Sequence, residues 1–325
     1  MTPSSRSAGR ACLRWRQRCT RSESGKVRSS VRAVACRVDL DAEHLARLAS
    51  EGAVPMTLSN AFNHSTPALY DRYMGPLLFE PYARLVSERA ARFQPNRMLE
   101  TAAGTGIVTR ALSEAVPQAQ IVATDLNPVM IEFATERVRS ERVAFQRADA
   151  QALPFPDGSF DLVVCQFGVM FFPDKVRANR EALRVLGAGG RYLLVSFDRL
   201  ELNPVPKAAE NAVAALFPED PPQYMERGPF SYADPALIEH DLMAAGFTDI
   251  QIETVALSSR VSASDAAQGL VLGSPFRSEI ERRDPSALDR AVNAVTEALR
   301  PWHGKNAPSS AHVVTATTRS SAPAS

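Results

Sequence analysis

The ten residues Arg97–Gly106 read Arg-Met-Leu-Glu-Thr-Ala-Ala-Gly-Thr-Gly and decide the fold. A short apolar strand over Arg97–Thr101 runs directly into a loop of small residues, and a helix is expected from about Thr105 to Ala115. Gly104 and Gly106 stand one residue apart in this turn, where the missing side chains let a ligand approach the backbone closely. The stretch therefore predicts a ligand-binding turn at the end of a strand.

Strand and helix signals alternate through the rest of the chain. Further strands are predicted at Gln120–Asp125, Arg142–Ala148, Phe160–Phe167, Arg191–Phe197, Asp249–Leu257 and His312–Thr318. Helices are predicted at 128–140, Pro173–Leu186 and 234–245, where Asn127-Pro128 and Asp234-Pro235 supply N-caps and Gly246 a stop. This rhythm predicts an α/β fold in which helices cover both faces of a mostly parallel sheet.

Four polar residues fall at the predicted strand ends, namely Glu100, Asp125, Asp149 and Gln166. Ligands of such sheets bind beyond the carboxyl ends of the strands, so we expect these side chains to share one site. Asp125 follows Gly106 by 19 residues, the position from which a carboxylate can accept hydrogen bonds from both ribose hydroxyls. A dinucleotide and S-adenosylmethionine both satisfy this pattern.

Three details favour S-adenosylmethionine. Thr109 stands where a dinucleotide-binding loop has its third glycine. Glu100 would repel a pyrophosphate but would attract the amino group of a methionine. Asp149 adds a further acid, suited to an adenine amino group and unsuited to a phosphate.

On these residues the sequence resembles the class I S-adenosylmethionine-dependent methyltransferases. The first motif of that family is similar to Glu100–Gly106, with Ala102 in place of the first of three glycines, and two further family segments are similar to Asp149–Asp161 and Glu181–Arg191. The subgroup contains ubiquinone- and menaquinone-biosynthesis methyltransferases. The resemblance covers roughly residues 60–318, and it is most specific over 97–197.

The resemblance implies a Rossmann-like sheet of seven strands with a helical cap, in which His312–Thr318 is the antiparallel seventh strand. It implies that the methionine is held by Glu100 and the glycine loop, the ribose by Asp125, and the adenine by residues after the second and third strands. Gln166 faces the methionine and the substrate entrance. The implied cofactor-binding set is Glu100, Ala102, Gly104, Gly106, Asp125, Leu126, Asp149, Ala150 and Gln166.

Simpler interpretations of several residues stay open. Asp125 can cap the following helix, Asp149 can form a turn, and Glu100 can be a solvated acid at a strand end. Cys165 reads better as a small buried apolar residue than as a nucleophile, because it lies within an apolar strand. Phe167, Phe171 and Phe172 read better as core than as a substrate-stacking surface.

Methyl transfer from a sulfonium is an in-line displacement, for which the protein mainly aligns the reacting groups. No triad or metal-binding cluster is evident, so the catalytic residue is left unknown and no metal is expected. His64 and Tyr73 are the only candidates for it. A surface or capping role for His64 and a packing role for Tyr70 and Tyr73 are the competing interpretations.

Composition bounds the domain organisation. Residues 1–38 carry ten basic residues against one acid, whereas the remainder carries an excess of eight acids, so no nucleic-acid partner is expected. We expect a basic leader at 1–55, a methyltransferase domain at 56–318 with cap segments at about 57–95, 199–232 and 262–303, a loop at 304–311 and a tail at 319–325. The leader reads first as non-functional or mis-started, with Met56 as the true start, second as a transit peptide, and third as a binding arm.

The expected protein is cytoplasmic, or organelle-targeted if residues 1–38 are a genuine transit peptide, and Leu162–Phe172, the longest apolar stretch, is too short to span a membrane. The leading hypothesis is a methyltransferase acting on a small molecule. The alternatives are a non-catalytic S-adenosylmethionine-binding or assembly protein and a nicotinamide-dependent oxidoreductase. The methyl acceptor and the oligomeric state are left open.

Overall fold

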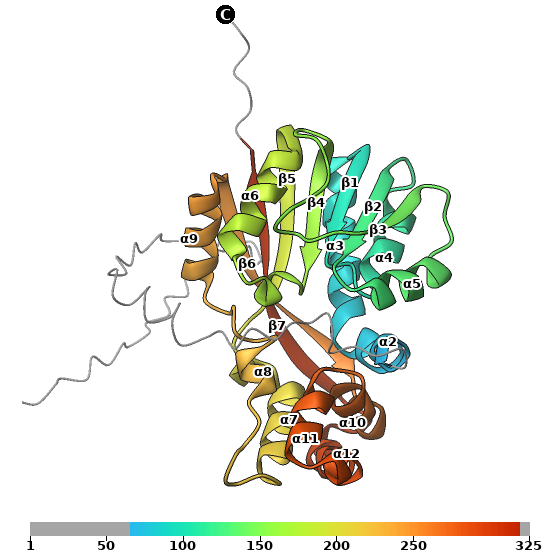
Figure 1. The fold of residues 1–325 in the computed structure, drawn as a ribbon, viewed down its shortest axis with the longest axis vertical. Coiled ribbons are helices and arrows are strands. Elements are labelled where there is room, and N and C mark those ends of the chain that lie inside the picture. Colours follow the sequence, from blue (N-terminus) through green and yellow to red (C-terminus); the bar gives the residue numbers. More distant parts are fainter. Residues whose placement is uncertain (1–65, 319–325) are drawn as a thin grey trace, which may run out of the picture. The chain divides into compact units, whose positions relative to one another are not determined.

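A computed structural model describes residues 66–318, which contain one seven-stranded sheet in the order β3-β2-β1-β4-β5-β7-β6 (Figure 1). Strands β1 to β5 run parallel, and β7 lies antiparallel between β5 and β6. The predicted antiparallel seventh strand is therefore confirmed. The strands are β1 (Arg97–Thr101), β2 (Gln120–Asp125), β3 (Val143–Arg147), β4 (Phe160–Gln166), β5 (Leu186–Phe197), β6 (Thr248–Arg260) and β7 (Asn306–Thr317).

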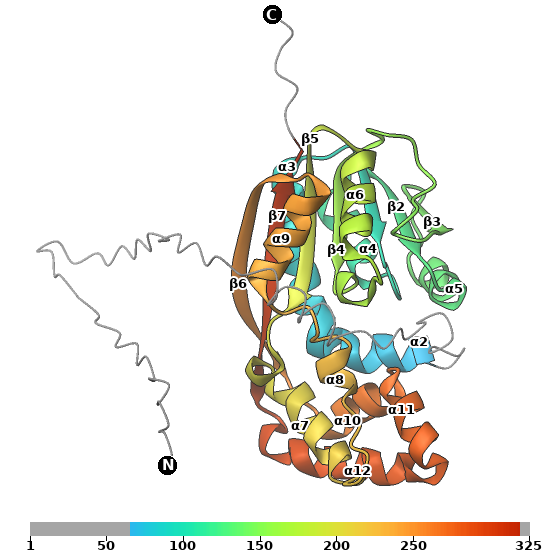
Figure 2. The ribbon, with the colours of Figure 1, turned by 60° about the vertical axis from the view of Figure 1, so that its left-hand side comes forward.

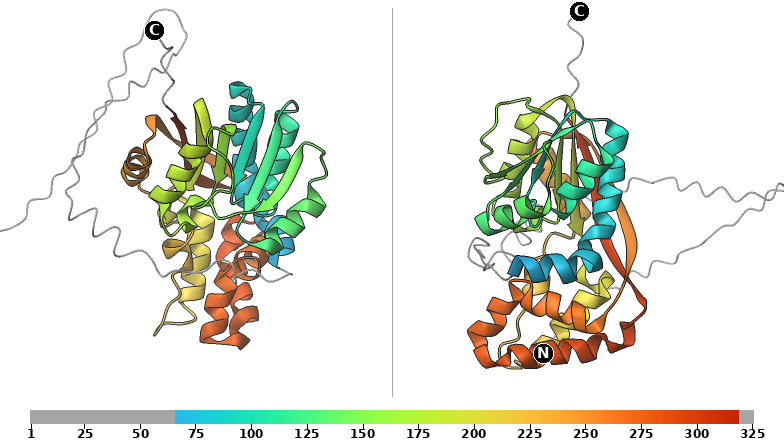
Figure 3. Two further views of the ribbon diagram at one scale, coloured as in Figure 1. Left: turned by 45° about the horizontal axis from the view of Figure 1, so that its top comes forward. Right: turned by 90° about the vertical axis from the view of Figure 1, so that its right-hand side faces the viewer.

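Helices cover both faces of this sheet, as predicted. Helices α3 (Glu80–Phe93) and α4 (Ile107–Ala115) pack together on one face, and α6 (Lys175–Val185) and α9 (Pro235–Ala245) pack together on the other (Figure 3). Helix α5 (Pro128–Arg137) packs on β2 and β3. The predicted caps are present, because the side chains of Asn127 and Asp234 accept hydrogen bonds from the backbone N–H groups two residues on, both at 2.9 Å.

A second group of helices lies beyond the carboxyl ends of the parallel strands (Figure 2). It comes from three separate parts of the chain: α2 (Thr66–Leu69) with the π-helix η2 (Tyr70–Phe79); η4 (Leu200–Leu202), α7 (Pro204–Ala214) and α8 (Tyr224–Arg227); and α10 (Ala263–Leu272), α11 (Phe276–Arg283), η5 (Pro285–Ala287), α12 (Leu288–Leu299) and η6 (Arg300–Trp302). Helix α10 contacts both η2 and α12, and α12 contacts α7. The segments 199–232 and 262–303 and residues 66–79 of the segment 57–95 thus supply helices at the edge of the sheet where ligands of this fold bind. Residues 80–93 of the segment 57–95 instead form α3 on a face of the sheet.

The sheet register brings the predicted site residues to one edge. Thr101 pairs with Thr124 across β1 and β2, and the β4–β5 ladder ends at Gln166. Strand β4 is buried at six of its seven positions, as expected for a parallel strand covered on both faces. A short 3-10 helix, η3 (Val169–Phe171), follows the end of β4 at this edge.

Two expectations about loops were wrong. Residues 306–311 belong to β7, because that strand pairs with β6 from Asn306 onward and with β5 from Ala311 onward. The helix predicted at Pro173–Leu186 does end before the glycine-rich residues 187–190, but these residues already belong to β5, which begins at Leu186 and not at the predicted Arg191. Pairing with neighbouring strands overrides the local turn composition in both segments. The calls on residues 1–55 and 319–325 lie outside the described residues.

Candidate cofactor site

The side chain of Glu100, in β1, points into the protein interior beside the turn between β1 and α4. Its side chain is buried, and the Thr109 hydroxyl donates to its Oε2 at 2.6 Å. Burial raises the pKa of Glu100 to about 8, and the nearby charge of Asp125 adds to the rise while the Thr109 hydrogen bond opposes it. Burial thus favours the protonated form of this carboxyl group. The interpretation of Glu100 as a solvated acid is wrong.

Asp125 connects the end of β2 to the glycine loop. Its Oδ2 accepts from the Gly104 amide at 2.9 Å, and its Oδ1 accepts from the Asn127 amide at 2.8 Å. Burial raises the pKa of this carboxyl group, and these backbone donors partly offset the rise. Each carboxylate oxygen has a second lone pair, so both oxygens retain capacity for a ligand hydroxyl.

In the loop after β1, every second residue has a left-handed backbone conformation. The φ angles are 55° at Ala102, 56° at Gly104 and 82° at Gly106. A Cβ on Gly104 would meet no atom within 4 Å, whereas one on Gly106 would lie 3.1 Å from the Val138 side chain. Gly106 is thus needed where the residue before α4 approaches Ala134 and Val138 at the end of α5, and Gly104 leaves open space beside the backbone.

Gln166 lies at the carboxyl end of β4, beneath the helix η2. Its Nε2 donates to the carbonyl oxygen of Phe79, the last residue of η2, at 3.1 Å. The ring of Tyr70, the first residue of η2, stacks on Phe79 at 4.8 Å, and burial raises the Tyr70 pKa with a contribution from Asp125. Helix η2 is therefore tied to the strand ends on which the predicted site residues stand.

The residues assigned to the adenine side follow β2 and β3. Leu126 exposes 46% of its surface and is one of three exposed large apolar side chains among residues 66–318. Asp149 forms a turn, in which its Oδ1 accepts from the Gln151 amide at 2.8 Å, and Ala150 lies in that turn. The Ala148 amide donates to the Asp125 carbonyl oxygen at 3.1 Å, so this turn adjoins Asp125.

Three buried polar atoms around this edge have no hydrogen-bond partner: Thr105 Oγ1, Asn127 Nδ2 and Gln166 Oε1. They follow or end β1, β2 and β4 respectively, so all three lie at the carboxyl edge of the sheet. Buried polar groups normally find partners, so each unpartnered group calls for an explanation such as a ligand or an ordered water. The two side-chain polar atoms of Asn179, on α6, are unpartnered as well. Carboxylates for hydroxyl and amino groups, together with the three atoms at the carboxyl edge, fit a nucleoside joined to an amino acid. Thr105 and Asn127 were not among the predicted residues, because an N-cap or loop residue gives no sequence signal of a second role.

The candidates for catalysis are less well defined. Tyr73 packs against α10, where a Cβ on Gly269 would lie 2.8 Å from the Tyr73 Cβ, and Arg72 lies over the Tyr73 ring. His64 lies outside the described residues. Cys165 is fully buried and its pKa is raised to about 11 by burial, so it is unsuited to act as a nucleophile. Phe167 is buried, and its ring stacks on Phe197 at 3.8 Å as part of the core.

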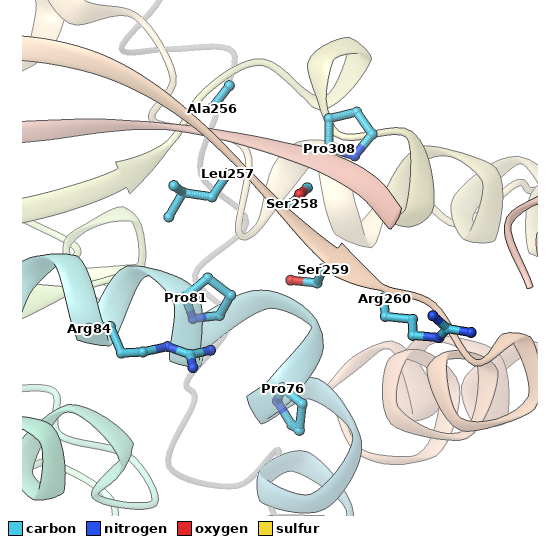
Figure 4. Close-up of a pocket in the computed structure, with 9 residues that line it drawn as sticks. All are labelled: Pro76, Pro81, Arg84, Ala256, Leu257, Ser258, Ser259, Arg260 and Pro308. Atoms are coloured by element: carbon cyan, nitrogen blue, oxygen red, sulfur yellow. The ribbon is translucent and has the colours of Figure 1, made fainter. Parts of the chain in front are cut away.

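A groove of about 730 Å³ lies elsewhere, along β6 (Figure 4). It is lined by Pro76, Pro81, Arg84, residues 256–260 and Pro308, and so by none of the predicted site residues. Across residues 66–318 no cluster of three His, Cys, Asp or Glu side chains is arranged to hold a metal. In the same range no helix is long and apolar enough to cross a membrane.

The strand order, the glycine turn after β1 and the acid at the end of β2 define the class I, S-adenosylmethionine-dependent methyltransferase type of domain. Comparison with known proteins agrees with this class. Residues 99–194 match the family model described as a methyltransferase domain, and the chain therefore contains a domain of that type.

The curated relatives include quinone methyltransferases. A demethylmenaquinone methyltransferase of Thermus thermophilus is 38% identical over 138 residues, which are 42% of this chain and 60% of the relative. The ubiquinone/menaquinone biosynthesis C-methyltransferase UbiE of Pseudomonas aeruginosa is 35% identical over 163 residues, which are 48% of this chain and 64% of the relative. The chain thus spans less than two thirds of the length of these relatives.

Solved structures share the fold at low sequence identity. The [4+2]-cyclase SpnF has a TM-score of 0.57 and 20% identity, and the match covers 83% of this chain and 98% of that one. Phosphoethanolamine N-methyltransferase 2 of Haemonchus contortus, solved with phosphomonomethylethanolamine and S-adenosylhomocysteine, has a TM-score of 0.52 and 19% identity, covering 80% and 59%. These likenesses establish the Rossmann-like architecture alone.

Proposed function

We propose that this protein is an S-adenosylmethionine-dependent methyltransferase that transfers a methyl group to a small-molecule acceptor by in-line displacement. The observation that carries the proposal is the junction at the carboxyl edge of β1 and β2. There the Asp125 carboxylate accepts a hydrogen bond from the Gly104 amide, and no atom fills the space beside the Gly104 backbone. The buried Glu100 lies in the strand that leads into this loop. We assign the cofactor to this junction, with the nine residues of the predicted set around it.

When bound, the cofactor supplies an activated sulfonium methyl group. Asp125 accepts hydrogen bonds from the ribose hydroxyls, and Leu126 covers the adenine. Glu100 and Gln166 Oε1 accept from the methionine ammonium group, which also favours the ionised form of Glu100. Helix η2 excludes water, because it closes over the strand ends through Phe79 and Tyr70. These residues position the reacting groups, and the proposal names no general base.

The acceptor belongs to the same proposal. Because the curated relatives are named for ubiquinone and menaquinone biosynthesis, an aromatic quinone-type ring is the first class of acceptor to assay. Tyr70, which is only partly buried and stacks on Phe79, is compatible with an apolar acceptor at this edge. The excess of acidic residues in the chain after residue 38 disfavours a nucleic acid as the methyl acceptor. A cytoplasmic location completes the proposal, and reporter fusions with and without residues 1–55 test it.

Two measurements test the function. Calorimetric titrations with S-adenosylhomocysteine and with NADH should give micromolar binding for the first and none for the second. Incubation with methyl-labelled cofactor and host metabolite extract, followed by mass spectrometry, should then yield a labelled small molecule. Tight binding of NADH without binding of S-adenosylhomocysteine would establish the oxidoreductase alternative instead.

One structural neighbour favours a second candidate function. SpnF is named a [4+2]-cyclase although it shares this fold, so the fold can serve a protein whose named reaction is not methyl transfer. The alternative is a protein that binds S-adenosylmethionine without transferring its methyl group. Micromolar binding of S-adenosylhomocysteine together with no labelled product across a broad extract would support it.

A further inference from the structure

Two loops at the carboxyl edge of the sheet touch through a single methyl group. Ala102 follows β1, and Gly168 follows Gln166 by two residues at the end of β4. A Cβ built on Gly168 would lie 2.4 Å from the Ala102 Cβ and 3.2 Å from the Cys165 sulfur. Carbon atoms that are not bonded do not approach to 2.4 Å. The missing side chain at residue 168 therefore makes the room that the Ala102 methyl group occupies.

Ala102 holds a conformation that favours glycine. Its φ of 55° places it in the left-handed region, where a residue with a Cβ is strained, and the family motif has glycine at this position. Such strain persists where the surrounding structure fixes it. Here the methyl group is seated against Gly168, so the two residues constrain each other.

A buried aromatic cluster packs against the turn after β4 on the side away from Ala102. Phe167 is also left-handed, with a φ of 55°, and its ring is held between two neighbours. It stacks on Phe197 at 3.8 Å and meets Tyr82 edge-on at 5.3 Å, and all three rings are buried. This aromatic cluster fixes the turn from the other side, so the distance between the two loops is set where Ala102 meets Gly168.

We propose that Ala102 and Gly168 form a matched steric pair that sets the spacing between the β1–α4 loop and the β4 turn. The pair thereby positions Gly104 and Gln166 relative to each other in the cofactor site, an inference that rests on the proposed function. Both members are positioning residues, since they act through their neighbours. Alanine is accommodated at position 102 because residue 168 has no side chain.

Four full-length proteins test the pair: the wild type, Ala102→Gly, Gly168→Ala and the double variant. The readout is the calorimetric affinity for S-adenosylhomocysteine, measured below the melting temperature of every protein. We expect Gly168→Ala to weaken binding by about tenfold or more, because an overpacked contact must displace one of the two loops. Adding Ala102→Gly removes the 2.4 Å contact and leaves only the 3.2 Å approach to the Cys165 sulfur. The double variant should therefore recover affinity to within about threefold of Ala102→Gly alone.

Gly187→Ala is the matched control. Gly187 lies at the start of β5, at the edge of the sheet opposite the proposed cofactor site. A Cβ at Gly187 would lie 3.6 Å from its nearest atom, the Gly158 carbonyl oxygen, and this distance is an ordinary van der Waals contact. This variant should bind S-adenosylhomocysteine as the wild type does. If only Gly168→Ala loses affinity and the double variant regains it, the loss is an effect of the pair. General destabilisation by replacing a glycine would not be reversed by Ala102→Gly.

Two results overturn the proposal: wild-type affinity in folded Gly168→Ala, or a double variant that binds no better than Gly168→Ala. If Gly168→Ala does not fold, the double variant decides, because folding with normal affinity supports the pair and failure to fold contradicts it. A wild type that does not bind S-adenosylhomocysteine overturns the proposed function instead. The non-additivity of the four melting temperatures then still measures the steric contact.

Discussion

The carboxylate of Asp125 accepts a hydrogen bond from the Gly104 amide at 2.9 Å, across 21 residues of sequence. This contact ties the end of β2 to the loop after β1, and it presents an acid and an open stretch of backbone side by side. Because the other oxygen of the same carboxylate accepts from the Asn127 amide, the side chain cannot rotate freely. The acid is thus oriented before any ligand arrives.

Replacing Asp125 with alanine should weaken binding of S-adenosylhomocysteine by about 1–3 kcal/mol, because ribose hydroxyls lose a charged acceptor. Isothermal titration calorimetry measures the change. Asp289→Ala, which removes an acid from the first turn of α12, is the control for net charge and should bind normally. Unchanged affinity in Asp125→Ala would contradict the placement of the ribose.

Replacing Gly104 with valine should abolish tight cofactor binding, because branched carbons would fill the open space beside the loop backbone. The left-handed φ of 56° also costs about 1–2 kcal/mol of stability for a residue with a Cβ. Affinity and melting temperature are therefore both to be measured.

Gly189→Val separates these two effects. Gly189 has a φ of 74° and open space around its Cβ position, but it lies at the opposite end of the sheet, in β5. It should lose a similar amount of stability and keep normal affinity. Equal loss of affinity in both variants would show that backbone strain, and not the ligand approach, explains the result at Gly104.

Much of this site could be predicted because its signals are local. A short strand, small residues and an acid at the end of the next strand occur within the 29 residues from Arg97 to Asp125, and the observed bounds of β1 and β2 match the prediction. The N-caps Asn127 and Asp234 were predictable for the same reason, since a cap acts within a few residues of itself.

Other features depend on contacts between distant parts of the chain. Glu100 reads as an acid at a strand end, and only its packing shows that it is buried, which raises its pKa. The contact between Ala102 and Gly168 joins two loops that are 66 residues apart. Residues 306–311 read as a loop by composition, and two neighbouring strands make them part of β7. Tertiary contacts of this kind leave no mark in a local pattern.

The ion pair between Asp71 and Arg137 should help hold η2 over the site, because it connects that helix to the end of α5. Asp71 is buried, while half of the Arg137 side chain is exposed, so the pair is screened on one side. Arg137→Ala should accelerate dissociation of S-adenosylhomocysteine severalfold and lower stability by about 1–3 kcal/mol, because the buried Asp71 carboxylate loses its cationic partner. Stopped-flow displacement measures the rate, and Arg290→Ala, on the surface of α12, is the control. An unchanged dissociation rate in Arg137→Ala would contradict a role for the ion pair in closing the site.

The pH dependence of stability should reveal the proton on Glu100. Its pKa is about 8 when folded and near 4.3 when unfolded, so the folded state binds more protons between these values. Stability therefore falls as the pH rises from about 4.5 to 8. Glu100→Gln removes this contribution. Between pH 5 and pH 8 the free energy of unfolding of Glu100→Gln, measured with urea, should therefore rise relative to that of the wild type by at least about 1 kcal/mol.

Glu114→Gln, which removes an exposed carboxyl group from α4, controls for the change in net charge. Its pH profile should follow that of the wild type. Parallel profiles for the wild type and Glu100→Gln would mean that Glu100 is already ionised in the folded protein.

Leu126→Ala should weaken cofactor binding without changing the stability of the protein. The Leu126 side chain is 46% exposed in the free protein, so Leu126→Ala should leave the melting temperature nearly unchanged. If the adenine covers this side chain, truncation removes apolar contact from the complex alone and weakens binding of S-adenosylhomocysteine by about 1 kcal/mol, or roughly fivefold. Met243→Ala, which truncates a 63% exposed side chain on α9, should change neither quantity. Equal affinities for the two variants would place the adenine away from Leu126, and the assignment of the β2 end to the nucleoside would then rest on Asp125 alone.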